Sequence, residues 1–138
     1  MKNPTVLHFL FLIFLLVIIS LIACKESTKS DEEIILPQSN ITYFKHIQKL
    51  FSVKCAAPGC HNYLDHSGEL DLTDYTSIMT KSVENELIVI PGYGEQSFLY
   101  RILLEDYKGE IRMPPNGPYL NSNNTNAVKV WIDEGAEP

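Results

Sequence analysis

The stretch Cys55-Ala56-Ala57-Pro58-Gly59-Cys60-His61 decides how this sequence is interpreted. Two thiols stand on either side of four residues, and an imidazole follows the second thiol directly. The four residues end in Pro58-Gly59, where proline fixes its own φ and glycine accepts a positive φ. The dipeptide therefore predicts a bulge that absorbs the extra chain between the two cysteines.

A Cys-x-x-Cys-His run is the attachment motif of haem c, in which two thiols bond to the haem vinyl groups and the histidine ligates the iron. Here Cys55 and Cys60 have four residues between them instead of two, and His61 follows. Two other interpretations remain open from these residues alone. A Cys55–Cys60 disulfide suits an exported protein, and a zinc ion could be bound by both cysteines with His61 and His66.

An electron-transfer haem usually takes a second axial ligand, and a methionine opposite the histidine raises the reduction potential. Beyond the first residue the sequence offers Met79 and Met113. Met79 lies in a short predicted helix that Thr73 can cap, so we expect it in the core. Met113 precedes two prolines, which exclude a helix and favour an extended loop able to hold the sulfur in a fixed place. His46 and His66 are interpreted as solvent-facing side chains.

Five stretches, in this order, resemble the Planctomycete-type cytochrome c domain. They are Cys55–His61, Gly68–Tyr75, Ile90–Tyr100, Arg112–Pro115 and Val130–Ala136. The resemblance implies an all-α class, a small cytochrome c-like helical domain wrapped around one covalently attached haem c. It also implies Cys55 and Cys60 as thioether donors, His61 as the proximal iron ligand and Met113 as the distal ligand. The four-residue spacing is longer than the family's usual spacing.

Apolar periodicity independently predicts helices compatible with such a fold. The first is expected after a capping Asn40, and the last from about Ser122 to Glu134, stopping at Gly135. The first helix is expected to carry its apolar face on Ile41, Phe44, Ile47, Leu50 and Phe51. A helix capped by Ser97 carries its apolar face on Phe98, Leu99, Ile102 and Leu103, and the last helix on Val128, Trp131 and Ile132. The first and last helices of a cytochrome c fold pack together beside the haem, so we expect Phe44 or Phe51 to contact Trp131.

The N-terminal segment has the layout of a secretory signal. An apolar run from Val6 to Ile22 ends in Leu21-Ile22-Ala23-Cys24. This ending resembles a bacterial lipobox, in which the cysteine receives a diacylglycerol and the chain is cut before it. The sequence thus predicts a signal peptide over residues 1–23, an acylated polar tether over 24–39 and the cytochrome c domain over 40–138. A membrane-spanning helix is the alternative for the same apolar run.

Charge narrows the classes of partner. The chain has 17 acidic and 11 basic residues, hence a net charge of −6, and its Lys and Arg residues do not cluster. Nucleic-acid binding, which requires a basic patch, is therefore not expected. Without residues 1–23 the charge becomes −7, because Lys2 is lost. This charge predicts an exported redox partner with a positive docking face.

These observations predict a membrane-tethered monohaem c-type cytochrome that carries single electrons between exported redox partners. No catalysis and no small-molecule substrate of its own are indicated. Lys25 follows the lipobox cysteine. It is not the aspartate that retains lipoproteins at the inner membrane under the enteric sorting rule, which favours the outer membrane. Two alternatives stay open: a haem-containing docking subunit or sensor of a larger complex, and a non-haem binding lipoprotein stapled by a Cys55–Cys60 disulfide.

Overall fold

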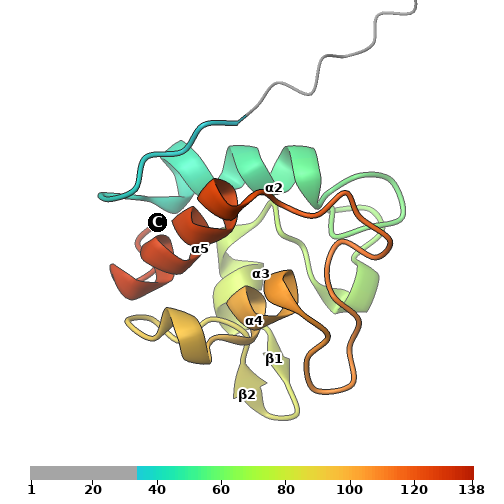
Figure 1. Cartoon of the computed structure of the whole chain (residues 1–138). Coiled ribbons are helices and arrows are strands. Elements are labelled where there is room, and N and C mark those ends of the chain that lie inside the picture. Colours follow the sequence, from blue (N-terminus) through green and yellow to red (C-terminus); the bar gives the residue numbers. More distant parts are fainter. Residues whose placement is uncertain (1–33) are drawn as a thin grey trace, which may run out of the picture. The chain divides into compact units, whose positions relative to one another are not determined.

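The computed structural model describes residues 34–138, which are rich in helix. Four α-helices follow one another along this part of the chain: α2 (Gln48–Lys54), α3 (Tyr75–Thr80), α4 (Phe98–Leu104) and α5 (Ser122–Asp133) (Figure 1). A π-helical turn, Tyr43–Ile47, leads into α2, and short 3₁₀ turns lie at Ser67–Glu69 and Gly94–Gln96. Within residues 34–138, no helix is long and apolar enough to cross a membrane.

A small hairpin departs from the predicted all-α class. Strands β1 (Ser82–Val83) and β2 (Glu86–Leu87) pair antiparallel, with Ser82 opposite Leu87 and Val83 opposite Glu86. The two residues between the strands, Glu84 and Asn85, both have positive φ, 51° and 67°. This is the backbone of a type I′ turn, whose twist matches that of the flanking strands. Strands of two residues are too short to produce an alternating sequence pattern, so the sequence did not indicate them.

The first and last helices pack against each other, as predicted, but through Tyr43. Its ring centroid lies 6.0 Å from that of Trp131, both side chains are fully buried, and Phe44 is 60% exposed. Of the two residues expected to contact Trp131, Phe44 is therefore excluded by its exposure, whereas Phe51 is fully buried in the same core as Trp131. Tyr43 can take the inner position because its hydroxyl donates a hydrogen bond to the Leu72 carbonyl at 3.0 Å, which satisfies its polar end.

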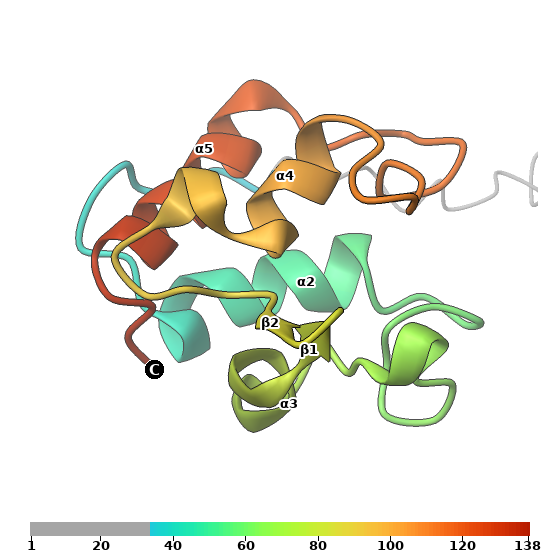
Figure 2. The ribbon, with the colours of Figure 1, turned by 90° about the horizontal axis from the view of Figure 1, so that it is seen from below.

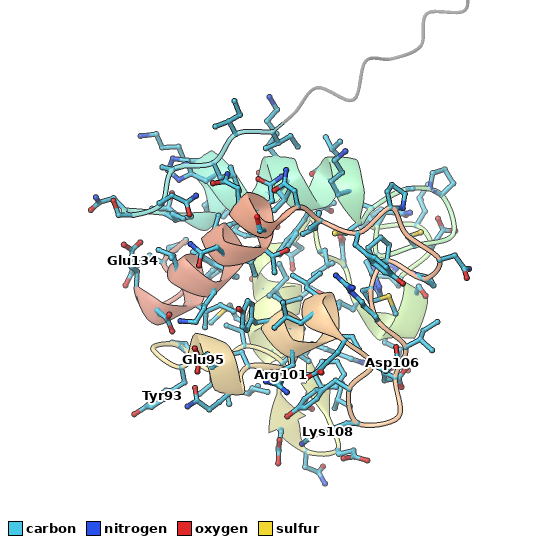
Figure 3. All side chains as sticks on the ribbon, in the orientation of Figure 1. Tyr93, Glu95, Arg101, Asp106, Lys108 and Glu134 are labelled. Carbon is cyan, nitrogen blue, oxygen red and sulfur yellow. The ribbon has the colours of Figure 1, made fainter. Side chains whose placement is uncertain are left out.

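Asn40 does not cap the first helix as predicted. Its φ is 54°, and the helical turn starts after Thr42 without a side-chain cap. The N–H groups of Asn40 and Ile41 instead donate to the two carboxylate oxygens of Glu134, each at 2.8 Å. Glu134, labelled in Figure 3, stands at the end of α5. One carboxylate thus ties the start of the first helix to the end of the last.

The ends predicted for α3 and α5 agree with the sequence to within one residue, whereas Ser97 precedes α4 without capping it, because its hydroxyl donates to the Tyr93 carbonyl at 2.9 Å. Asp74, rather than Thr73, caps α3 by accepting the Ser77 N–H at 2.7 Å. The last helix begins at Ser122 as expected and ends at Asp133, and Gly135 follows with a φ of 105°. Positive φ is available to glycine without steric cost, so it suits a helix end.

The core extends into the segment that the sequence assigned to the polar tether. Ile34 and Leu36 are each only 7% exposed and pack with the other core residues. Ile34–Pro138 forms one compact unit. Phe51 belongs to this core, and Met79 packs against it, as predicted. The fully buried large side chains at its centre are Trp131, Tyr43, Phe51, Ile41, Ile47, Leu50, Ile78 and Ile132.

Candidate functional site

The chain between the two cysteines forms the bulge that Pro58-Gly59 predicts. The Cys60 N–H donates to the Ala57 carbonyl at 2.9 Å, and Gly59 has a φ of 81°. Proline second and a positive-φ glycine third are the signature of a type II turn. The four-residue spacing is therefore absorbed by one compact turn.

The same segment is closed at its ends by backbone hydrogen bonds. Cys55 is joined to the last turn of α2, because its N–H donates to the Phe51 carbonyl at 2.8 Å. The His61 N–H then donates back to the Cys55 carbonyl at 3.1 Å. The His61 carbonyl accepts from the Leu72 N–H at 2.9 Å, which connects the loop to the chain leading into α3. Both thiols and the imidazole thus belong to one closed loop at the end of α2.

The imidazole of His61 is oriented by a single contact. Its Nδ1 lies 2.8 Å from the Ser67 carbonyl oxygen, and the side chain is half-buried. A carbonyl oxygen can only accept a hydrogen bond, so Nδ1 carries the proton. Nε2 then has its lone pair free to bind a metal. A backbone carbonyl behind the ring is the usual partner of a metal-ligating histidine, and it leaves no mark in the sequence because any residue could supply it.

The two thiols occupy different environments. Neither thiol is in a disulfide and both residues are half-buried. Cys55 borders the apolar core, whereas the Cys60 thiol donates to the Pro58 carbonyl at 3.9 Å. Burial, and to a lesser degree the neighbouring Cys60 thiol, raises the pKa of Cys55 to about 12. Cys55 is therefore a neutral thiol in apolar surroundings at physiological pH. An apolar vinyl group of a haem is compatible with these surroundings.

In the part of the chain that the structure describes, no contact supports the disulfide or the zinc site considered for these cysteines. Cys55 and Cys60 are not joined by a disulfide. Among residues 34–138, no group of three or more His, Cys, Asp or Glu side chains is arranged to hold a metal ion. His66, the fourth zinc ligand considered from the sequence, is exposed, with its ring 5.8 Å from that of Tyr63.

Met113 lies on a loop that is anchored on both sides of it. Its own N–H donates to the Ile102 carbonyl in α4 at 2.8 Å, and its side chain is half-buried against the core. The preceding Arg112 donates its N–H to Asp106, labelled in Figure 3, at 2.8 Å. The Arg112 guanidinium lies over the Tyr119 ring, 3.7 Å from its centroid. The sulfur is therefore carried by a well-anchored segment, as its position before two prolines predicts.

The loop that carries Met113 and the loop that carries Cys60 and His61 lie at the same end of the folded unit. In Figure 2 the orange loop after α4 and the green loop after α2 are both at this end, one on each side of the last turn of α2. Figure 1 shows the same two loops together on one side. The two loops come from segments about 50 residues apart in the sequence and lie at one end of the folded unit.

His46 and His66 were the other candidate iron ligands in the sequence. His46 is half-buried, and its Nδ1 accepts the Thr42 N–H at 3.1 Å, so it is not simply solvent-facing as predicted. His66 is exposed, as expected. Sequence analysis also missed Asn62 and Asp65, whose side chains bind the loop between the cysteines. An Asn with an Asp three residues later is a signal for a side-chain-supported turn, but the segment it supports could not be identified without the structure.

A comparison with known families adds an independent finding. The sequence model of the Planctomycete cytochrome C family matches residues 58–117. The matched range contains Cys60, His61 and Met113, and it confirms the resemblance seen in the sequence. It begins three residues after Cys55 and ends before the stretch Val130–Ala136. Neither a curated protein nor a solved structure matches the chain.

Proposed function

Since residues 58–117 match the Planctomycete cytochrome C family, we propose that this chain is a monohaem c-type cytochrome that carries single electrons and catalyses no reaction of its own. Cys55 and Cys60 would hold the haem by two thioether bonds, with His61 and Met113 as axial ligands. The observation that supports this most strongly is the contact between His61 Nδ1 and the Ser67 carbonyl at 2.8 Å. It presents Nε2 as a ligand from the residue that directly follows the second thiol.

A haem c held by these residues supplies reversible one-electron exchange at its iron. The chain's own contribution is to bind and to tune. The thioether of Met113 favours the reduced iron and so raises the reduction potential. Cys55 packs against the core, and burial beside a haem is one of the features by which a protein tunes its reduction potential.

The proposed setting is the cell envelope, where Cys24 would carry the lipid anchor, with the outer membrane favoured over the inner. Cys24 and the apolar run before it lie outside the described residues, so the support is the lipobox pattern of the sequence. The expected charge of −7 after removal of residues 1–23 favours a redox partner with a positive face. Association should then slow as salt screens the attraction.

A spectroelectrochemical titration of the purified protein tests the electron-carrier function. We expect one reversible wave with a Nernst slope of about 59 mV per decade, as for a one-electron couple. A matched variant, Cys55→Ser with Cys60→Ser, should show no such wave from covalently held haem. Two separate waves would contradict a single haem. Reduced protein that binds carbon monoxide readily would contradict a closed His/Met site and favour the sensor alternative.

A further inference from the structure

The side chains of Asn62 and Asp65 bind the segment between the two cysteines at two points. The Asn62 amide donates to the Ala57 carbonyl at 2.9 Å. One carboxylate oxygen of Asp65 accepts the Gly59 N–H at 2.7 Å. Ala57 and Gly59 flank Pro58, so the two contacts hold the type II turn on both sides of its proline.

The two side chains also hold each other in place. The Asn62 amide donates a second hydrogen bond to the same Asp65 oxygen at 2.8 Å. The Asn62 Oδ1 accepts the N–H groups of Leu64 and Asp65 at 2.8 and 3.0 Å. Every hydrogen-bonding position of the Asn62 side chain is therefore used. The clamp, meaning Asn62 and Asp65 with these bonds, is preorganised by its own turn.

The attachment loop needs such a clamp because it is two residues longer than the usual motif. Each added residue brings backbone freedom that must be lost before the two thiols take a defined separation. Asn62 directly follows His61 and is half-buried, whereas the turn that it holds is exposed. The clamp therefore supplies, from the chain after the histidine, contacts that the exposed turn does not obtain from the core.

We propose that Asn62 and Asp65 are positioning residues for haem attachment, and that they allow the four-residue spacing between Cys55 and Cys60 to serve in place of the two-residue spacing. This inference rests on the proposed function and deepens it. In each attachment the sulfur bonds to one vinyl carbon and the thiol proton is transferred to the other. The addition consumes no oxidant or reductant. It requires only that each sulfur be held at its own vinyl group, which the clamp secures through the path of residues 56–59.

The sharpest test compares clamp variants in two backgrounds. Asn62→Asp keeps the acceptor of the Asx turn, removes both donors and places a carboxylate beside Asp65. The second background deletes Pro58 and Gly59, which restores two residues between the cysteines and removes both the type II turn and the Gly59 N–H that Asp65 accepts. Asn126→Asp, at an exposed position of α5 where the amide contacts only Gln38, introduces the same charge as a matched control.

All variants of the full chain are made in cells that mature c-type cytochromes. Iodoacetamide labelling followed by mass spectrometry then separates chains with two thioethers, which expose no free thiol in the loop, from chains with one. In the natural spacing, Asn62→Asp should raise the ratio of one to two thioethers at least about fivefold, because it removes two hydrogen bonds and the loss of one alone has an effect of about that size. In the shortened loop it should change this ratio less than twofold, as should Asn126→Asp in either background.

An independent measurement covers the case in which a variant receives no haem. In protein made without haem, hydrogen exchange of the Gly59 amide should accelerate about fivefold or more in Asp65→Ala, which removes its acceptor. Equal effects of Asn62→Asp in both backgrounds, or an unchanged Gly59 exchange rate, would overturn the positioning role alone. Absence of covalent haem from the unaltered protein would instead overturn the proposed function, and the inference with it.

Discussion

Burial of Cys55 has a measurable chemical consequence in protein made without haem. Its pKa rises from the ordinary 9.0 to about 12, first because burial disfavours the thiolate and then because the Cys60 thiol is near. Only the thiolate reacts with iodoacetamide. A rise of three units lowers the thiolate fraction about 1000-fold near neutral pH, so alkylation of Cys55 should be slower in the folded protein by roughly that factor than in urea.

Peptide mass spectrometry over a time course of labelling measures this ratio for Cys55 directly. Cys60→Ser removes the smaller cause of the shift and leaves burial, so Cys55 should remain slow in that variant. Equal rates in the folded and urea-unfolded protein, or a difference below about tenfold, would refute the reasoning, since the thiol would then be in contact with water. Recovery of fast labelling in Cys60→Ser would show that the neighbouring thiol, rather than burial, is the main cause.

Three further predictions concern the ligand, the core and pH. Met113→Ala should lower the reduction potential and let carbon monoxide bind the reduced protein. Met79→Ala should instead lower the free energy of unfolding, measured with urea, by about 2 kcal/mol and leave the potential unchanged. The reverse pattern would make Met79 the iron ligand and Met113 the core residue. Tyr43→Phe leaves a buried carbonyl unpaired and should lower the free energy of unfolding by about 1–2 kcal/mol, and an unchanged value would contradict the buried hydrogen bond. The Asn62 amide and a backbone N–H lower the pKa of Asp65. The Asp65 carboxylate therefore stabilises the loop fully above its unfolded pKa of about 3.9, and this stabilisation is lost as pH falls through the lower folded pKa. Protection of the loop amides from hydrogen exchange should persist at about pH 4 and disappear only in stronger acid. Loss of this protection near pH 5 would contradict the prediction.

The sequence predicts those parts of the site that depend on the backbone preferences of individual residues. Pro58-Gly59 indicates a turn because proline and glycine each restrict or permit particular φ values, and the type II turn follows. The two prolines after Met113 exclude a helix for the same kind of reason. Helices α4 and α5 were predictable because their apolar residues recur with helical spacing.

Contacts between distant segments or with backbone atoms were not predictable in the same way. The Ser67 carbonyl behind His61 could come from any residue type. Tyr43 was passed over for Phe44 because burial of a tyrosine depends on an acceptor that the sequence does not reveal. Ile34 and Leu36 were assigned to a tether, since the three consecutive apolar residues Ile34-Ile35-Leu36 in a polar stretch show no period. Each of these depends on which segments the fold brings together.

An absorption spectrum of the detergent-solubilised protein shows whether Cys55 and Cys60 bind haem covalently. The sample is measured oxidised and dithionite-reduced, and again as a pyridine haemochrome after extraction with acidified acetone. We expect sharp reduced bands and a haem that stays with the polypeptide through extraction, while the Cys55→Ser, Cys60→Ser variant loses it. A colourless protein from cells able to mature cytochromes, or haem that extracts fully from the unaltered chain, would contradict the account.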